Sequence, residues 1–233
     1  MVKVEVLTLR DIWFRYSGND DYVLKGINLK LSRSELSIIK GPNGSGKSTL
    51  LLIAAGLLIP EKGEVLLYGK ALTDQLPQAR RKIGITFQDP EDQFFNATVY
   101  DEIAFALRQL RTPEDAIRSK VTEIAEALGI GRLLNKPPYK LSGGEKVKVA
   151  LASVLIYDPE VLLLDEPTAY LTISTKSELM NLLKNLRDSG KTIVIVTNDS
   201  DMMKYYIDKS YLLINGSLYE ENKHIRPTEN PIL

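Results

Sequence analysis

The sequence contains no cysteine, which excludes disulfide bonds, iron–sulfur clusters and zinc sites built on thiolates. It also lacks a long hydrophobic run. The longest, residues 50–59, is far below the roughly 20 apolar residues that a membrane-spanning helix needs. The first ten residues interleave acidic, basic and apolar side chains, unlike a signal peptide. We therefore expect a soluble, cytosolic chain that reaches a membrane only through a partner.

There is no excess of charge of either sign, because Lys and Arg together number 30 and Asp and Glu together also number 30. This balance argues against a protein that binds nucleic acid over its whole surface, and no nucleic-acid partner is expected. Hydrophobic residues make up 44% of the 233 residues, which is sufficient for a packed core. The length suits one large α/β domain or a core domain with an inserted subdomain.

Hydrophobic patterning predicts an α/β protein. Continuous apolar strands at 36–40, 161–164 and 193–196, with a crossover helix at 174–186, indicate a buried parallel sheet. Residues 4–16 and 27–31 alternate as strands of a half-buried sheet do, and further strands are expected at 64–68 and 82–87. Apolar residues at helical spacing fill 99–134. Asn215-Gly216 predicts a hairpin between 210–214 and 217–219. We expect one domain over 1–220, a helical insert at about 89–158, and a polar tail over 221–233.

A glycine-rich motif follows the strand at 36–40. It fits the phosphate-binding loop pattern and precedes an apolar helix expected at 50–58. Small residues allow backbone N–H groups to turn inward around phosphates, Lys47 supplies a fixed positive charge, and the Ser48 hydroxyl suits Mg²⁺. The alternative, an ordinary glycine turn, fits these flanks poorly. The residues expected to bind ATP here are Gly41, Pro42, Asn43, Gly44, Ser45, Gly46, Lys47, Ser48 and Thr49.

Two carboxylates follow the apolar strand at 161–164. A strand of a parallel sheet that ends in a carboxylate places it at the edge where ligands of open α/β folds bind. Asp165 is therefore a candidate Mg²⁺ ligand, and Glu166 a candidate base that orients or deprotonates the attacking water. Taken alone, an ordinary acidic pair at a strand end would be an equally good interpretation.

A second anion-binding turn precedes the helical run at 146–156. Two glycines and a serine at a helix start can bind an anion, yet the chain already has a phosphate-binding loop. The natural explanation is that this turn serves a nucleotide held by a second subunit. The turn consists of Leu141, Ser142, Gly143, Gly144 and Glu145.

With these motifs in this order, the sequence resembles the ATPase subunits of the ABC family from Tyr16 to Asn198. The resemblance implies a RecA-like phosphate-loop NTPase core with an antiparallel β subdomain and an inserted helical subdomain. It also implies that two subunits enclose two ATP molecules head to tail, so that Ser142 and Gly144 contact the partner's γ-phosphate. Tyr16 would stack on adenine, or else be a half-buried core tyrosine. Gln88 would touch Mg²⁺ and sense the γ-phosphate, or else be a solvated strand end.

Two positions depart from the family pattern. Asn198 stands where most members have histidine, and its amide can still donate to a γ-phosphate but cannot become cationic. Thr172 stands where an aspartate is usual, and Tyr170 replaces a residue that is usually small. The sole histidine, His224, lies in the tail and is interpreted as a surface residue. Because Glu166 is retained, we expect a slowed but active ATPase, paired by preference with a second, different ATPase subunit.

The segment over residues 87–99 resembles the corresponding part of ATPases in energy-coupling-factor uptake systems and their cobalt and nickel relatives. The resemblance implies an importer of a metal ion or vitamin, with the chain bound at the cytoplasmic face of the membrane. The segment would then face a helix of an integral membrane subunit, where Asp89, Glu91 and Asp92 would meet arginines. A solvated acidic loop is the alternative for these three residues.

Two other functions share part of this pattern. One is a soluble ABC ATPase of cofactor assembly or nucleic-acid work. The region between Gln88 and Ser142 is too short for the coiled-coil arm of a DNA-repair ATPase, and the chain has one ATPase unit where translation factors of the family have two. A role in iron–sulfur assembly stays open, since such ATPases are also single and soluble. The other is a small-molecule kinase with a phosphate-binding loop, which would not need the turn at 141–145.

Overall fold

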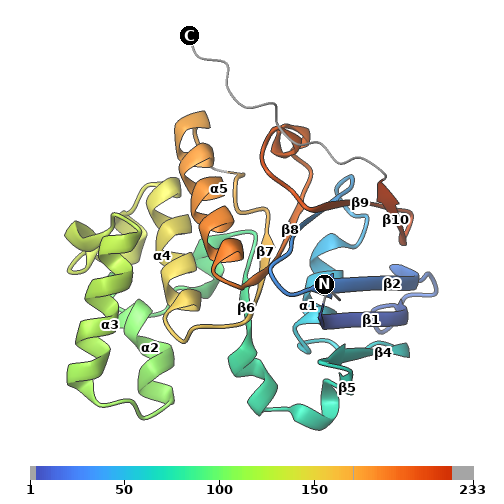
Figure 1. The fold of residues 1–233 in the computed structure, drawn as a ribbon, viewed down its shortest axis with the longest axis horizontal. Coiled ribbons are helices and arrows are strands. Elements are labelled where there is room, and N and C mark those ends of the chain that lie inside the picture. Colours follow the sequence, from blue (N-terminus) through green and yellow to red (C-terminus); the bar gives the residue numbers. More distant parts are fainter. Residues whose placement is uncertain (1–3, 170, 222–233) are drawn as a thin grey trace.

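The computed structural model describes residues 4–169 and 171–221, and in these ranges the strands form two sheets (Figure 1). The smaller sheet is antiparallel and has the strand order β2-β1-β4-β5. Its strands are β1 (Glu5–Phe14), β2 (Leu24–Ser32), β4 (Lys62–Leu67) and β5 (Lys70–Ala71).

The larger sheet has the order β10-β9-β3-β8-β7-β6. All neighbouring strands pair in parallel except β10, which returns antiparallel beside β9. The predicted strand at 36–40 and the predicted hairpin are confirmed, with positive φ at both Asn215 and Gly216. The strands are β3 (Leu36–Lys40), β6 (Ile83–Thr86), β7 (Val161–Asp165), β8 (Thr192–Thr197), β9 (Lys209–Ile214) and β10 (Ser217–Glu221).

Helices cover both faces of the larger sheet, which explains why its central strands are buried throughout. Among the described residues, no helix is long and apolar enough to span a bilayer. The α-helices are α1 (Lys47–Ala54), α2 (Val99–Gln109), α3 (Glu114–Ala127), α4 (Gly143–Leu155) and α5 (Ile173–Asp188). Short 3₁₀ turns are η1 (Thr73–Gln75), η2 (Gln78–Lys82), η3 (Pro90–Gln93), η4 (Gly131–Leu133), η5 (Pro138–Lys140) and η6 (Ser200–Lys204).

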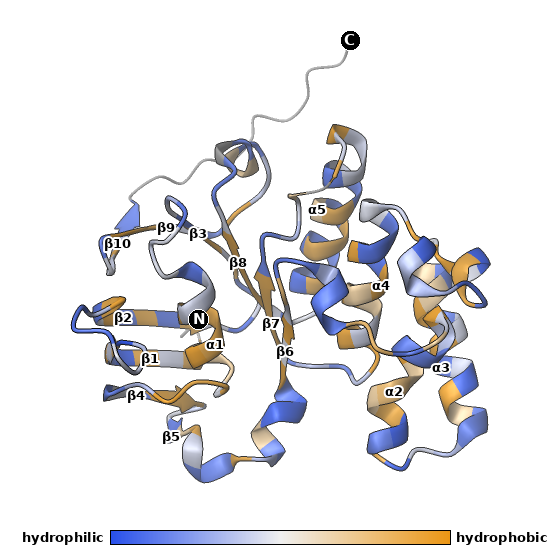
Figure 2. Ribbon diagram, turned by 180° about the vertical axis from the view of Figure 1, so that it is seen from behind, coloured by the Kyte–Doolittle hydropathy of each residue, from blue (hydrophilic) through white to orange (hydrophobic). Residues whose placement is uncertain are grey.

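Alternate residues of each parallel strand enter different hydrophobic cores. Along β7, Val161 and Leu163 join a core with α1 and the antiparallel sheet, whereas Leu162 and Leu164 join one with α2–α5. The ribbon views show α1 between the two sheets and α2–α5 on the opposite side, with apolar faces turned inward (Figure 2). The parallel sheet therefore holds the site's strand ends between two packed layers.

Several element boundaries differ from the sequence prediction, and two of these differences lie next to the phosphate-binding loop or the predicted adenine site. The helix after the phosphate-binding loop ends at Ala54 rather than at residue 58. Gly56 adopts a left-handed φ of 70°, and the N–H groups of Gly56 and Leu57 bond back to Ile53 and Leu52, which is a Schellman C-cap. Strand β1 ends at Phe14, so Tyr16 lies in the loop after it rather than in the strand.

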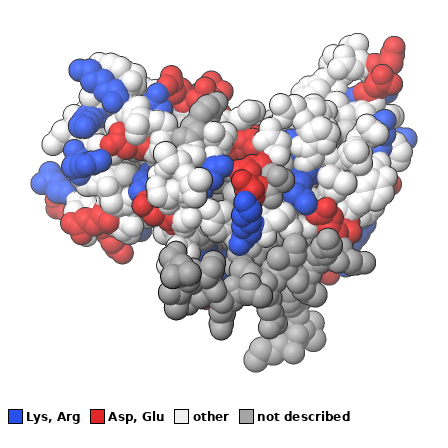
Figure 3. Space-filling model, turned by 90° about the horizontal axis from the view of Figure 1, so that it is seen from above, with Lys and Arg blue, Asp and Glu red and all other residues white. Residues whose placement is uncertain are grey.

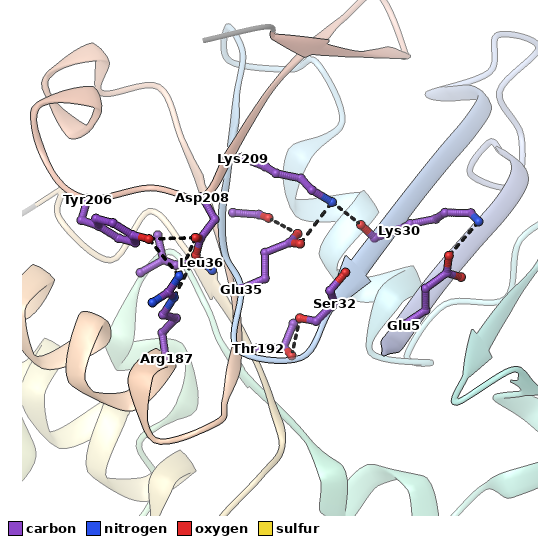
Figure 4. A network of polar contacts seen from close by, with 11 residues as sticks. Glu5, Lys30, Ser32, Glu35, Leu36, Arg187, Thr192, Tyr206, Asp208 and Lys209 are labelled. Atoms are coloured by element: carbon purple, nitrogen blue, oxygen red, sulfur yellow. Dashed lines mark hydrogen bonds and ion pairs between the residues drawn. The ribbon is translucent and has the colours of Figure 1, made fainter. Parts of the chain in front are cut away.

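Polar contacts link α5 with strand ends of both sheets, at the end of the larger sheet away from the phosphate-binding loop (Figure 4). The Arg187 guanidinium makes two hydrogen bonds to Asp208, at 2.6 and 3.0 Å, and Asp208 also accepts the Leu36 backbone N–H. Beside it, the buried Glu35 pairs with Lys209 at 3.1 Å. On the face shown in Figure 3, acidic and basic side chains are interspersed.

Candidate active site

Residues 41–46 connect β3 to α1 in a tight loop, and a side chain larger than that of glycine has no room at either end of it. A Cβ on Gly41 would lie 2.3 Å from the Leu213 carbonyl oxygen. Gly46 has a φ of 100°, and a Cβ there would lie 2.9 Å from the Leu24 side chain. Glycine is therefore required at both positions.

Lys47 is the fixed cation of the loop. It is the first residue of α1 and is buried. Its Nζ donates to the carbonyl oxygens of Gly41 (2.9 Å) and Pro42 (3.2 Å) and lies 3.9 Å from Glu166 Oε1. The N-cap residue Gly46 has no side chain to cap the first turn, and that turn has no acidic residue. The positive helix end and the Lys47 ammonium therefore favour an anion at the same place.

One open cavity of about 500 Å³ brings most of the predicted site together. Tyr16, Gln88, Asp165 and Glu166 line it with the loop, as the sequence predicted. Val23 also lines it and was missed, because its position depends on the Val23 N–H bonding to the Phe14 carbonyl across the β1–β2 turn. The full lining is Tyr16, Val23, Asn43, Gly44, Gly46, Lys47, Ser48, Thr49, Gln88, Asp165 and Glu166.

Tyr16 stands at the wall of this cavity. Its ring packs edge-on against Phe14, and its hydroxyl shares a 3.0 Å hydrogen bond with Thr49 Oγ1. The side chain is 42% exposed, so part of the ring remains open. An exposed aromatic face beside a phosphate-binding loop can stack on a flat base.

Asp165 ends β7 with a buried carboxylate. Burial raises the pKa of Asp165, opposed by a hydrogen bond from Ser48, while the neighbouring Glu166 raises it further. Its Oδ1 is buried without a hydrogen-bond partner among the described residues. An unsatisfied carboxylate oxygen beside a serine hydroxyl is the oxygen-rich environment that Mg²⁺ prefers. No group of three or more acidic or histidine side chains suited to a metal occurs in the described ranges.

Glu166 is held from the side of β8. Its Oε2 accepts the Thr197 hydroxyl at 2.8 Å and its Oε1 accepts the Asn198 backbone N–H at 2.9 Å. Its backbone has a φ of 46°, in the left-handed region that non-glycine residues rarely adopt. Sequence reasoning missed Thr197, which has no distinguishing signal in the strand pattern.

The side chain of Asn198 points to the phosphate-binding loop, where its Nδ2 donates to Asn43 Oδ1 at 3.0 Å. Asn198 does not line the main cavity, although its hydrogen-bond partner Asn43 does. Gln88 lies at the end of β6 and is exposed toward the cavity.

The second anion-binding turn is the start of α4. Ser142 caps the helix, and Glu145 accepts the Ser142 backbone N–H at 3.0 Å, which completes a capping box. Hydrogen bonding from Ser142 lowers the pKa of Glu145. None of residues 141–145 lines the cavity that the phosphate-binding loop forms. The predicted second anion-binding turn therefore does not share a cavity with the phosphate-binding loop.

Thr172 is the N-cap of α5, where its Oγ1 accepts the Thr175 N–H. Aspartate is an equally good N-cap residue, so the threonine keeps the capping function and loses only the charge. Tyr170 and His224 lie outside the described residues.

The acidic segment after Gln88 is partly engaged within the chain. Asp89 caps η3 by accepting the Glu91 N–H at 2.9 Å, and Glu91 pairs with Lys146 of α4. Asp92 is exposed, and its side chain makes no hydrogen bond or ion pair to the described residues. Of the three carboxylates, Asp92 is the one most available to a partner.

A glycine-rich loop, a buried lysine and a carboxylate at the carboxyl ends of parallel strands together define a phosphate-loop nucleotide-binding protein. The family model described as ABC transporter matches residues 24–169, more than half of the chain. The chain therefore belongs to the ABC transporter family, as one of its ATP-binding, ATP-hydrolysing subunits.

Individual relatives agree with this assignment. The energy-coupling factor transporter ATP-binding protein EcfA of Methanocaldococcus jannaschii is 42% identical over 219 residues, which cover 93% of this chain and 78% of that protein. EcfA2 of Clostridium perfringens is 40% identical and covers 91% of this chain and 75% of its own length. Among solved structures, cbiO1 of Clostridium perfringens, part of the ABC transporter complex cbiONQ, has a TM-score of 0.83 at 38% identity, covering 93% of this chain and 88% of that one. A dimeric bacterial ABC transporter cassette has a TM-score of 0.85 at 31% identity, and the match covers 92% of this chain and 97% of that one.

Proposed function

We propose that this chain is the ATPase subunit of an energy-coupling-factor transporter, a class of importer that takes up metal ions or vitamins. The names of relatives about 40% identical over most of the chain support the transporter class. The single observation that carries the ATPase assignment is the cavity that gathers the phosphate-binding loop, Tyr16, Gln88, Asp165 and Glu166.

Each residue of this cavity has a proposed role. Tyr16 stacks on adenine, and residues 41–49 surround the phosphates. Ser48, Gln88 and Asp165 hold Mg²⁺, which would draw charge from the γ-phosphate oxygens when bound. The partnerless Asp165 Oδ1 supports this ligand set. Glu166 orients or deprotonates the attacking water, and Gln88 and Asn198 contact the γ-phosphate.

The second phosphate-binding turn serves the ATP of a partner subunit. Its support is that residues 141–145 do not line the cavity of their own loop. Two ATPase subunits then enclose two nucleotides, each between the loop of one chain and the Ser142 turn of the other. We infer that the partner is a different ATPase subunit, because a homodimer would carry the changes at Asn198 and Thr172 in both sites.

An integral membrane subunit completes the assembly, and the chain lies at the cytoplasmic face of the membrane without entering it. The exposed segment after Gln88 is the proposed contact. Residues 1–220 would work as one ATPase domain, with the helices of about 89–158 as its inserted subdomain and 221–233 as a polar tail.

The test is affinity purification of the full chain from detergent-solubilised membranes, with mass spectrometry and ATPase assay of the captured complex. We expect a polytopic membrane protein and a second ATPase in defined proportion to this chain. A Lys47→Ala variant should capture the same complex with lower ATPase activity, because the ATP site built on this chain's loop is lost. Purification of an active ATPase that contains no membrane protein, from membranes and from cytosol alike, would contradict the transporter assignment.

A further inference from the structure

The end of β8 holds Glu166 at three points. The Glu166 backbone N–H donates to the Val196 carbonyl at 2.9 Å, which stabilises a φ of 46°. The Thr197 hydroxyl donates to Oε2 at 2.8 Å, and the Asn198 backbone N–H donates to Oε1 at 2.9 Å. Both the backbone and the carboxylate of Glu166 are therefore positioned by three consecutive residues at the end of β8, Val196, Thr197 and Asn198.

The Thr197 hydroxyl is the one side-chain group among these three contacts. Thr197 is fully buried, and its Oγ1 also accepts the Asp199 N–H at 3.0 Å. A hydroxyl has one hydrogen to donate, so accepting from Asp199 leaves that hydrogen directed at Glu166. The hydroxyl orientation is set by the backbone and does not depend on solvent.

The competing partner of Glu166 is Lys47. Its Nζ lies 3.9 Å from Oε1, which is longer than the contacts from Thr197 and Asn198. If the Glu166 carboxylate formed a close ion pair with Lys47, it would offset the positive charge that Lys47 offers to phosphate. The carboxylate would then also turn away from the position proposed for the γ-phosphate. Two short hydrogen bonds from the β8 side oppose that movement, because charge-assisted hydrogen bonds are strong and directional.

We propose that Thr197 is a positioning residue for ATP hydrolysis, holding the Glu166 carboxylate away from Lys47 and aimed at the attacking water. The inference rests on the proposed role of Glu166 as the base. It also explains how the site accommodates asparagine at 198, since the second contact comes from the backbone N–H, which any residue at 198 except proline supplies.

The test compares the full chain, purified with its co-purifying subunits, with variants at Thr197. Thr197→Val keeps the shape and removes the donor. We expect kcat to fall about 10- to 100-fold, the effect of losing one hydrogen bond to a charged group. The KM for ATP and the affinity for ADP should change less than about 2-fold, since Thr197 does not line the cavity. Thr197→Ser should restore most of kcat. If the valine variant does not fold, Thr197→Ala against Thr197→Ser isolates the same hydroxyl.

Thr192 provides a matched control at the opposite end of β8 (Figure 4). It is equally buried, and its hydroxyl donates to the Ser32 carbonyl at 2.9 Å, outside the cavity. Thr192→Val should lose comparable stability but keep parental kcat. An equal fall of kcat in both valine variants would assign the effect to stability and overturn the proposal.

A double variant separates this inference from the proposed function. If Thr197 acts through Glu166, Thr197→Val should add little in a Glu166→Gln background. Parental turnover in Thr197→Val beside slow turnover in Glu166→Gln would overturn the positioning role alone. Parental turnover in Glu166→Gln would overturn the assignment of the base, and the role of Thr197 with it.

Discussion

The side-chain amide of Asn198 donates a hydrogen bond to Asn43 Oδ1 at 3.0 Å, and so connects the end of β8 to the phosphate-binding loop. The two residues are far apart in sequence and meet because β3 and β8 are neighbours in the parallel sheet. An asparagine amide has a second N–H, which stays available to a phosphate oxygen. Asn198, at the position where most family members have histidine, therefore keeps a hydrogen-bond donor beside the loop. Unlike histidine, it cannot become cationic.

Lys47→Ala should abolish ATP binding or weaken it by orders of magnitude. Lys47 is the buried cation of the loop, and its removal also leaves Glu166 without its nearest positive charge. Isothermal calorimetry of ATP binding measures the effect. Lys40→Ala, at the end of β3 but outside the cavity lining, is the control and should bind normally. An unchanged affinity in the Lys47 variant would contradict the assignment of the loop.

Glu166→Gln should keep ATP affinity and slow hydrolysis by roughly 10²- to 10⁴-fold, the usual contribution of a positioned base. The amide preserves shape but cannot take a proton from water. Phosphate release measures the rate, and size-exclusion chromatography with ATP should show an ATP-stabilised dimer. Glu64→Gln, which changes a carboxylate on β4 paired with Arg10, should hydrolyse normally. Parental turnover in the Glu166 variant would show that another group activates the water.

Replacing Asp89, Glu91 and Asp92 together with their amides should weaken the complex with the membrane subunit and leave ATP affinity unchanged. Because Asp89 caps η3 and Glu91 pairs with Lys146, Asp92→Asn alone should account for most of the loss. Binding of the parental chain should weaken with salt, as expected for exposed ion pairs. Detergent pull-down at two salt concentrations measures both effects. A complex of normal strength with the triple variant would identify the segment as solvated surface.

Lys176→Met should lower the free energy of unfolding by about 0.5–1 kcal/mol at pH 7, because the Lys176–Asp199 pair is only partly exposed. The hydrogen bond from Lys176 lowers the pKa of Asp199 below its ordinary value. A carboxylate with a depressed folded-state pKa stabilises the protein above its unfolded pKa of about 3.9, and the stabilisation is lost as the pH falls through the folded-state value.

The difference between the parental chain and the Lys176 variant should therefore shrink below about pH 4. Chemical denaturation from pH 7 to pH 3 measures it. Lys204→Met removes a fully exposed pair with Asp201 and should have almost no effect at any pH. If the difference in the free energy of unfolding between the parental chain and the Lys176 variant grew on acidification, the Lys176–Asp199 ion pair would not be its source.

The phosphate-binding loop, the buried strands and the acidic pair were predictable because local spacing determines them. The sequence also predicted that Tyr16, Gln88, Asp165 and Glu166 belong to one site, and they line one cavity. The contacts of Thr197 and Val23 were not predictable, since each depends on which strands are neighbours. The capping role of Thr172 was predictable, because a threonine directly before a helical run is an N-cap signal. It was missed because Thr172 was interpreted only as a replacement for the aspartate usual in the family.

Restoring Asn198→His and Thr172→Asp together should raise the hydrolysis rate of the chain when it is purified alone. In the proposed dimer, each composite site takes position 198 from one subunit and position 172 from the other, so a homodimer would carry both changes in both sites. An intact partner would leave one change in each site. Removal of one preorganised transition-state donor can cost about 2.7–4 kcal/mol, so the arrangement with a different partner is favoured. Because aspartate caps helices as well as threonine does, the change at 172 should not destabilise α5.

Steady-state phosphate release from the parental chain, both single variants and the double variant measures the effect. Equal, rapid turnover by all four would show that this chain needs no second kind of ATPase subunit.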